Sequence, residues 1–65
     1  MMTENMKIWL KELYLSEADE HFGTASNEHL WALGSDNEEA MMLHEINAAE
    51  HRDFAEMLIS MANKI

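Results

Sequence analysis

The stretch Ser35–Asn63, SDNEEAMMLHEINAAEHRDFAEMLISMAN, decides the fold because its apolar residues recur at the spacing of one long helix. It opens with Ser35 and Glu38, which match a capping box, where the two side chains satisfy each other's backbone amides at a helix start. Neither glycine nor proline interrupts residues 36–63. We therefore predict a helix over 36–63, which is unusually long for a chain of 65 residues.

Two stripes of apolar residues run along this predicted helix, and each needs a partner. The stripe that we expect to pack on the N-terminal part of the chain holds Leu43, Ile46, Phe54, Met57, Met61 and Ile65. The second stripe holds Met41, His44, Ala48, His51, Ala55, Leu58 and Ala62. Its alanines recur every seven residues, a spacing that lets two helices approach closely. We predict that it is the interface of a homo-oligomer, most simply a dimer; the alternative is cover from within the monomer.

Upstream of this helix, the only two glycines predict helix ends, since glycine is common just past the last turn. Gly23 and Gly34 both follow apolar residues, and the chain has no proline. They predict one helix over about 4–22 and a short one over about 27–33. The residues expected to cap the starts of these helices are Thr3 and Ser26.

The expected fold is therefore all-α, with three helices in a single domain over 1–65. The first and third helices would form an antiparallel hairpin. A chain this short buries only about 60% of the surface that its unfolded form exposes. Because it has no cysteine, disulfides cannot compensate. Assembly of the hairpin into a helical-bundle homo-oligomer is the expected solution.

Charge limits the possible partners. Thirteen acidic residues against four basic ones give a formal net charge of −9, and residues 12–51 contain no lysine or arginine. Such a chain cannot neutralise phosphates, so we expect no nucleic-acid binding and no attraction to anionic membranes. No apolar run approaches the roughly 18 residues of a membrane span, and the N-terminus lacks the pattern of a signal peptide. We expect a cytoplasmic protein.

The histidines raise the question of a metal or acid/base site. The HExxH motif needs histidines four residues apart, but His44 and His51 are seven apart, about 10.5 Å along a helix. No glutamate has a histidine three residues later, so the Glu-x-x-His pattern of di-iron bundles is missing too. There is also no glycine-rich phosphate loop. We predict neither an enzyme nor a cofactor, and keep His44 and His51 as candidates for a zinc or nickel site across a symmetric interface. The other ligands would be their symmetry mates, or Glu17 and His21 of the first helix.

Two acidic residues fall among apolar ones on their helices. These are Glu17 in the first helix and Glu50 in the third. Buried carboxylates need cationic or hydrogen-bonding partners, for which histidines are the nearest candidates. Either the two form a polar pocket, or they reach the rim and help to fix how the helices align.

These observations favour a small acidic helical module that self-associates and binds another protein. The acidic residues expected to face such a partner, possibly a basic one, are Asp19, Glu20, Glu38, Glu45, Asp53 and Glu56. Acidic residues at fixed spacing could also imitate phosphates, so one alternative is a DNA mimic that blocks a nucleic-acid-binding enzyme. A second alternative is an oligomer that binds a metal or small ligand on its His44/His51 face.

Overall fold

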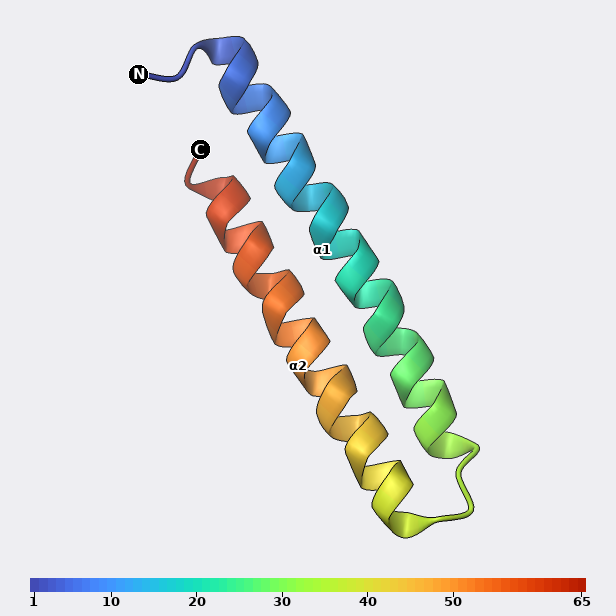
Figure 1. Ribbon diagram of the computed structural model, residues 1–65. Coiled ribbons are helices and arrows are strands. Elements are labelled where there is room, and N and C mark those ends of the chain that lie inside the picture. The colour runs from blue at the N-terminus through green and yellow to red at the C-terminus, as the bar shows by residue number, and fades with distance from the viewer.

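A computed structural model describes residues 1–65 as two antiparallel helices joined by a short turn (Figure 1). Helix α1 spans Glu4–Leu33 and helix α2 spans Glu38–Asn63. The two lie side by side, and both chain termini are at the end opposite the turn (Figure 1). The molecule is a rod of 52 × 13 × 12 Å. The prediction of an all-α helical hairpin is confirmed. Neither helix is long and apolar enough to cross a membrane.

The prediction of three helices is wrong, because α1 continues through Gly23. The segments expected at 4–22 and 27–33 belong to one helix, and Ser26 lies inside it rather than at a start. Gly23 does not adopt a positive φ, and a Cβ added there would meet nothing within 4 Å. A glycine in a helix interior costs only about 1 kcal/mol relative to alanine. Packing on both sides of Gly23 outweighs a cost of that size.

The ends of α1 agree only partly with prediction. The Thr3 hydroxyl accepts a hydrogen bond from the Met6 amide at 3.1 Å, so the predicted N-cap is confirmed. At the other end, Gly34 does follow the last helical residue, but with φ −90° and ψ 0°. That is the right-handed region, so the left-handed stop that suggested glycine does not occur here. Residues other than glycine also adopt this conformation.

The start of α2 differs from the predicted capping box. Asn37 is the N-cap, and its side-chain oxygen accepts from the amides of Glu39 at 2.8 Å and Ala40 at 3.3 Å. Ser35 instead donates its hydroxyl to the Trp31 carbonyl at 2.8 Å, which helps to close the end of α1. The helix therefore begins at Glu38 rather than at 36. Asparagine is as good an N-cap as serine, so the nearer residue takes the role.

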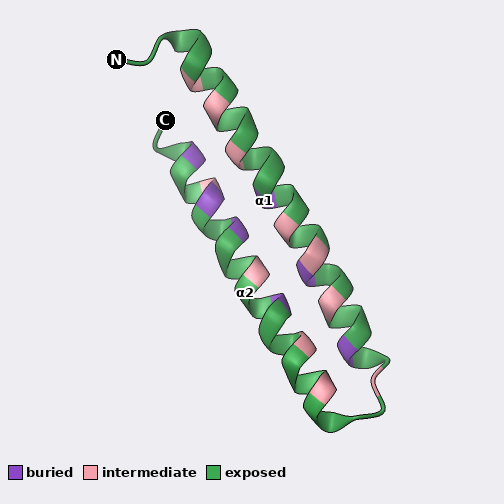
Figure 2. Cartoon of the chain, in the orientation of Figure 1, coloured by how far each residue is buried: buried purple, intermediate pink, exposed green.

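Small side chains line the contact between the helices. Buried positions lie where the two helices face each other (Figure 2). Apart from Leu58, every buried residue is an alanine: Ala18, Ala25 and Ala32 in α1, and Ala48, Ala55 and Ala62 in α2. Both sets repeat every seven residues, the spacing of a left-handed pair of helices, and alanine lets the backbones come close. Consequently, no large side chain is fully buried.

Candidate functional site

The stripe predicted to contact a second chain lies instead between α1 and α2. Its residues Ala48, Ala55, Leu58 and Ala62 are buried, His44 and His51 are half-buried, and Met41 is exposed. The stripe expected to pack on α1 is exposed: Leu43, Ile46, Phe54, Met57, Met61 and Ile65. The two stripes have exchanged roles relative to our expectation. The structure agrees with the alternative, in which the alanine stripe is covered by α1 of the same chain.

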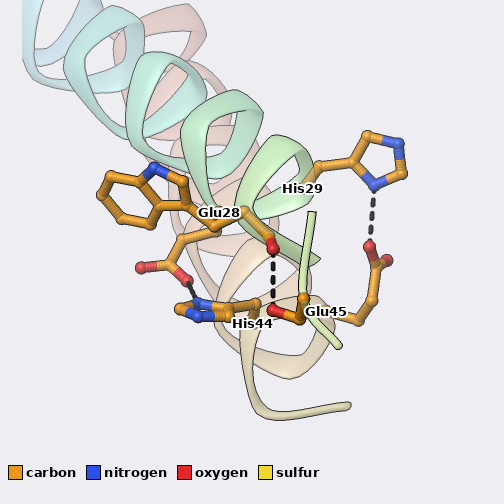
Figure 3. A network of polar contacts seen from close by, with 6 residues as sticks. Glu28, His29, His44 and Glu45 are labelled. Atoms are coloured by element: carbon orange, nitrogen blue, oxygen red, sulfur yellow. Dashed lines mark hydrogen bonds and ion pairs between the residues drawn. The ribbon is translucent and has the colours of Figure 1, made fainter. Parts of the chain in front are cut away.

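Near the turn, two polar pairs join the helices (Figure 3). His44 and Glu28 meet at 2.6 Å between Nδ1 and Oε2, and His29 and Glu45 meet at 2.8 Å between Nδ1 and Oε1. The sequence Glu28-His29 in α1 thus faces its reverse, His44-Glu45, in α2. We call these four residues the polar clasp. Because a shift of the helices by seven residues would place His21 or Ser35 opposite His44 instead of Glu28, the His44–Glu28 pair helps to specify which residues of the two helices lie opposite each other.

The two pairs of the polar clasp differ in exposure. The side chains of His44 and Glu28 are 33% and 13% exposed, whereas those of His29 and Glu45 are 51% and 47% exposed. The Trp31 ring also lies edge-on to the His44 ring, with centroids 5.8 Å apart. A hydrogen bond that is shielded from water contributes more than an exposed one. The His44–Glu28 pair is therefore the stronger half of the clasp.

Midway along the hairpin, His21 of α1 meets His51 of α2. Their Nδ1 atoms are 2.9 Å apart, and the two rings are roughly stacked, with centroids 5.1 Å apart and planes at 26°. The Phe54 ring packs on His21 with centroids 4.7 Å apart. Unlike the histidines of the clasp, neither ring has a carboxylate partner. No group of three or more histidine, aspartate or glutamate side chains is placed to hold a metal ion within the chain.

The hairpin has two broad faces, which the contacts distinguish. Phe54 contacts His21, while Glu45, nine residues or about 180° away on α2, pairs with His29 on the other side. In α1, Trp31 contacts His44 and so lies on the side of Phe54. We call this side the histidine face. Helical spacing from Phe54 and Trp31 places six exposed apolar side chains on it: Met6, Leu13, Trp31, Leu43, Phe54 and Met61.

The opposite side, which we call the acidic face, carries the exposed pair His29–Glu45. Spacing from these two residues places four exposed apolar side chains of α1 on it: Ile8, Leu15, Phe22 and Leu33. Of the acidic residues predicted to face a partner, four lie on this side: Asp19, Glu38, Glu45 and Glu56. Glu20 falls on the histidine face, seven residues after Leu13, and Asp53 points away from α1. The predicted acidic set is therefore divided among three sides of the rod.

Glu17 and Glu50, the two misplaced acids of the sequence, are both exposed. Glu17 lies one helical turn before His21, and Glu50 lies one turn before Phe54, so both belong to the histidine face. Neither carboxylate forms a hydrogen bond or ion pair within the chain. Together with Glu20 they place negative charge midway along a face whose two ends are apolar.

Sequence reasoning identified His44 and His51 and named His21 as one possible partner, and His21 does contact His51. It missed Glu28 and His29, because the helix end predicted at Gly23 assigned them to a separate short helix. The available signal was the mirrored order of Glu28-His29 and His44-Glu45, which places each histidine opposite a glutamate in an antiparallel pair of helices.

Comparison with known proteins identifies no family to which the chain belongs, and no curated protein or solved structure matches it.

Proposed function

We propose that this chain is a non-enzymatic acidic helical module that pairs with a second copy of itself through the histidine face and binds another protein. One observation carries the proposal: nineteen large apolar side chains are exposed, while the contact between the helices buries almost only alanines. Each of the six buried alanines contributes one methyl group, or about 0.8 kcal/mol. Ordering a residue's backbone costs about 1–2 kcal/mol, so the hairpin requires further burial.

The solvent-exposed area of the chain supports a second copy as the partner that covers the histidine face. The chain exposes 5003 Å², whereas a compact protein of its mass exposes about 4,200 Å². The difference of roughly 800 Å² is close to the area that each partner contributes to a standard interface, which is also about 800 Å². A rod 13 × 12 Å in cross-section that pairs side by side with its copy becomes a four-helix bundle, in which both apolar ends are covered.

The negative charge of the chain supports a different protein, rather than a second copy, as the partner of the acidic face. The net charge of −9 doubles to −18 in a dimer, and the acidic residues outside the histidine face stay in water. Such a surface attracts a basic protein surface and accelerates its association. Of the four predicted acidic residues on this face, three have no ion-pair partner within the chain: Asp19, Glu38 and Glu56. Lysine substitutions at Glu38 and Glu56 should weaken binding of the partner, leave the dimer intact, and reduce the dependence of binding on salt.

The dimer is tested by two leucines that form a matched pair. Leu13 and Leu15 are both 41% exposed and lie on the same helix, but on the histidine face and the acidic face respectively. We expect light scattering to give about 15 kDa for the unmodified protein, twice the 7.5 kDa of one chain. Leu13→Glu should reduce the measured mass to that of one chain, because it places a carboxylate in the interface.

The matched variant Leu15→Glu should keep the mass of the dimer. A mass of 7.5 kDa for the unmodified protein would overturn self-association. Equal behaviour of the two variants would overturn the assignment of the interface to the histidine face. Circular dichroism on each variant separates loss of the dimer from loss of helix.

A further inference from the structure

The histidines of this chain fall into two kinds. His29 and His44 each bond to a glutamate, whereas His21 and His51 have only each other, Nδ1 to Nδ1 at 2.9 Å. Two imidazole nitrogens at this distance share one proton, since one must donate and the other accept. The two Nδ1 atoms face each other across the contact between the helices, and a metal ion bound by both nitrogens can take the place of the shared proton.

The spacing of the two nitrogens matches a chelated transition metal. Nitrogen–metal bonds are about 2.0–2.1 Å long, so two ligands at 90° stand about 2.9 Å apart and two at the tetrahedral angle about 3.3 Å. The observed 2.9 Å fits the right angle of octahedral or square-planar coordination. Imidazole is a preferred ligand of Ni²⁺ and Cu²⁺, which adopt these geometries. Both rings are half-buried, and the contact of Phe54 with His21 limits the orientations of that ring.

The charge around the pair also favours a cation. Glu17 and Glu50 lie within one turn of these histidines in sequence, on the same face, and neither has a basic partner. A divalent ion held by His21 and His51 would offset their negative charge. No third side chain of the same chain is placed to join the coordination, so water fills the remaining positions.

We propose that His21 and His51 together bind one divalent transition-metal ion per chain, as a clamp that joins α1 to α2. The two ligands come from different helices, thirty residues apart, so the site forms only in the folded hairpin. Metal binding and folding are therefore coupled. The site is contained in one chain and does not rest on the dimer proposed above. It also differs from the predicted His44/His51 site, because Glu28 engages His44.

Titration calorimetry with NiCl₂ tests the clamp. We expect one ion per chain with a dissociation constant in the micromolar range, and a melting temperature that rises with the concentration of Ni²⁺. His21→Ala and His51→Ala should each weaken binding at least about tenfold, since each removes one of two protein ligands. The control His29→Ala, which removes an exposed histidine paired with a glutamate, should bind as the unmodified protein does.

Two further measurements test the metal clamp without relying on the folding of the histidine variants. In NMR spectra of the unmodified protein, paramagnetic Ni²⁺ should broaden the ring signals of His21 and His51 before those of His29 and His44, which requires no variant to fold. The Leu13→Glu variant should still bind one ion, whether or not the dimer exists. Absence of uptake, equal broadening of all four histidines, or uptake that requires the dimer would each overturn the clamp.

Discussion

The two ends of the contact between α1 and α2 are built from different chemistry. On the terminal side of the His21–His51 pair, Ala18, Ala55 and Leu58 form an apolar cluster, with Tyr14 and Ile59 packed against it. Near the turn, the polar clasp of Glu28, His29, His44 and Glu45 takes the corresponding place (Figure 3). Alanines continue between the helices at both ends, so the spacing of the backbones stays the same while the side chains around them change.

The apolar cluster and the polar clasp contribute to different properties of the hairpin. The first stabilises the contact between the helices, and the second favours one alignment of the helices. A repeat of alanines every seven residues on both helices fits almost equally well after a shift of seven residues, so apolar packing alone leaves the alignment weakly defined. After such a shift, His44 would face His21 or Ser35 rather than Glu28, and the hydrogen bond would be lost. The apolar cluster thus contributes burial without fixing the alignment, and the clasp favours one alignment.

The largest effect is expected at the apolar end. Ala55 has 0% exposure, so Ala55→Glu forces a carboxylate between two closely packed helices. We expect a loss of about 3–5 kcal/mol, which is enough to remove most of the helical signal in far-UV circular dichroism. The control Ala49→Glu changes an exposed position of the same helix and should alter stability by less than about 0.5 kcal/mol. A helical, monomeric Ala55→Glu variant would instead support Ala55 as part of an interface between chains.

A smaller effect is expected at the polar end, and its two pairs should differ. Glu28→Ala removes the shielded partner of His44 and should cost about 1–2 kcal/mol, because the half-buried ring loses its hydrogen bond. Glu45→Ala removes the exposed partner of His29 and should cost under about 0.5 kcal/mol. Urea unfolding at neutral pH measures both. Equal losses would contradict the ranking of the two pairs, and two negligible losses would contradict the role of the clasp.

The sequence was sufficient to predict the hairpin and the long second helix, but not which side of that helix faces inward. Large apolar side chains gain most from burial, which favours Leu43, Phe54 and Met57 as the core. Two long helices that lie close together instead select the smallest side chains for their contact, so Ala48 and Ala55 are inside. Hydrophobicity favours the large side chains for the buried side of the helix, whereas close packing of two helices favours the alanines. The sequence pattern of one helix alone does not show which of the two effects is larger.

The missing information lay in the first helix. Ala18, Ala25 and Ala32 repeat with the same spacing as the alanines of α2, and the repeat continues through Gly23. A shared repeat on the two helices places the glycine inside a helix rather than at its end. The polar clasp was beyond prediction for a related reason, and His21 was only one of several possible partners of His51. Partners in an antiparallel hairpin depend on the position of the turn, and the division at Gly23 misplaced it.

A modest gain in stability, rather than a loss, is expected at the glycine between the two ends. An added Cβ at Gly23 meets nothing within 4 Å, and the backbone is helical there, so Gly23→Ala should stabilise the protein by about 0.5–1 kcal/mol. The control Gly34→Ala, at the end of α1, should change stability less, because that residue is outside the helix interior. Thermal and urea unfolding of both variants provide the comparison. If Gly23 instead ended a helix in the left-handed conformation, alanine there would destabilise the protein, since a Cβ disfavours that conformation. The sign of the change at one residue therefore decides between one continuous α1 and two shorter helices.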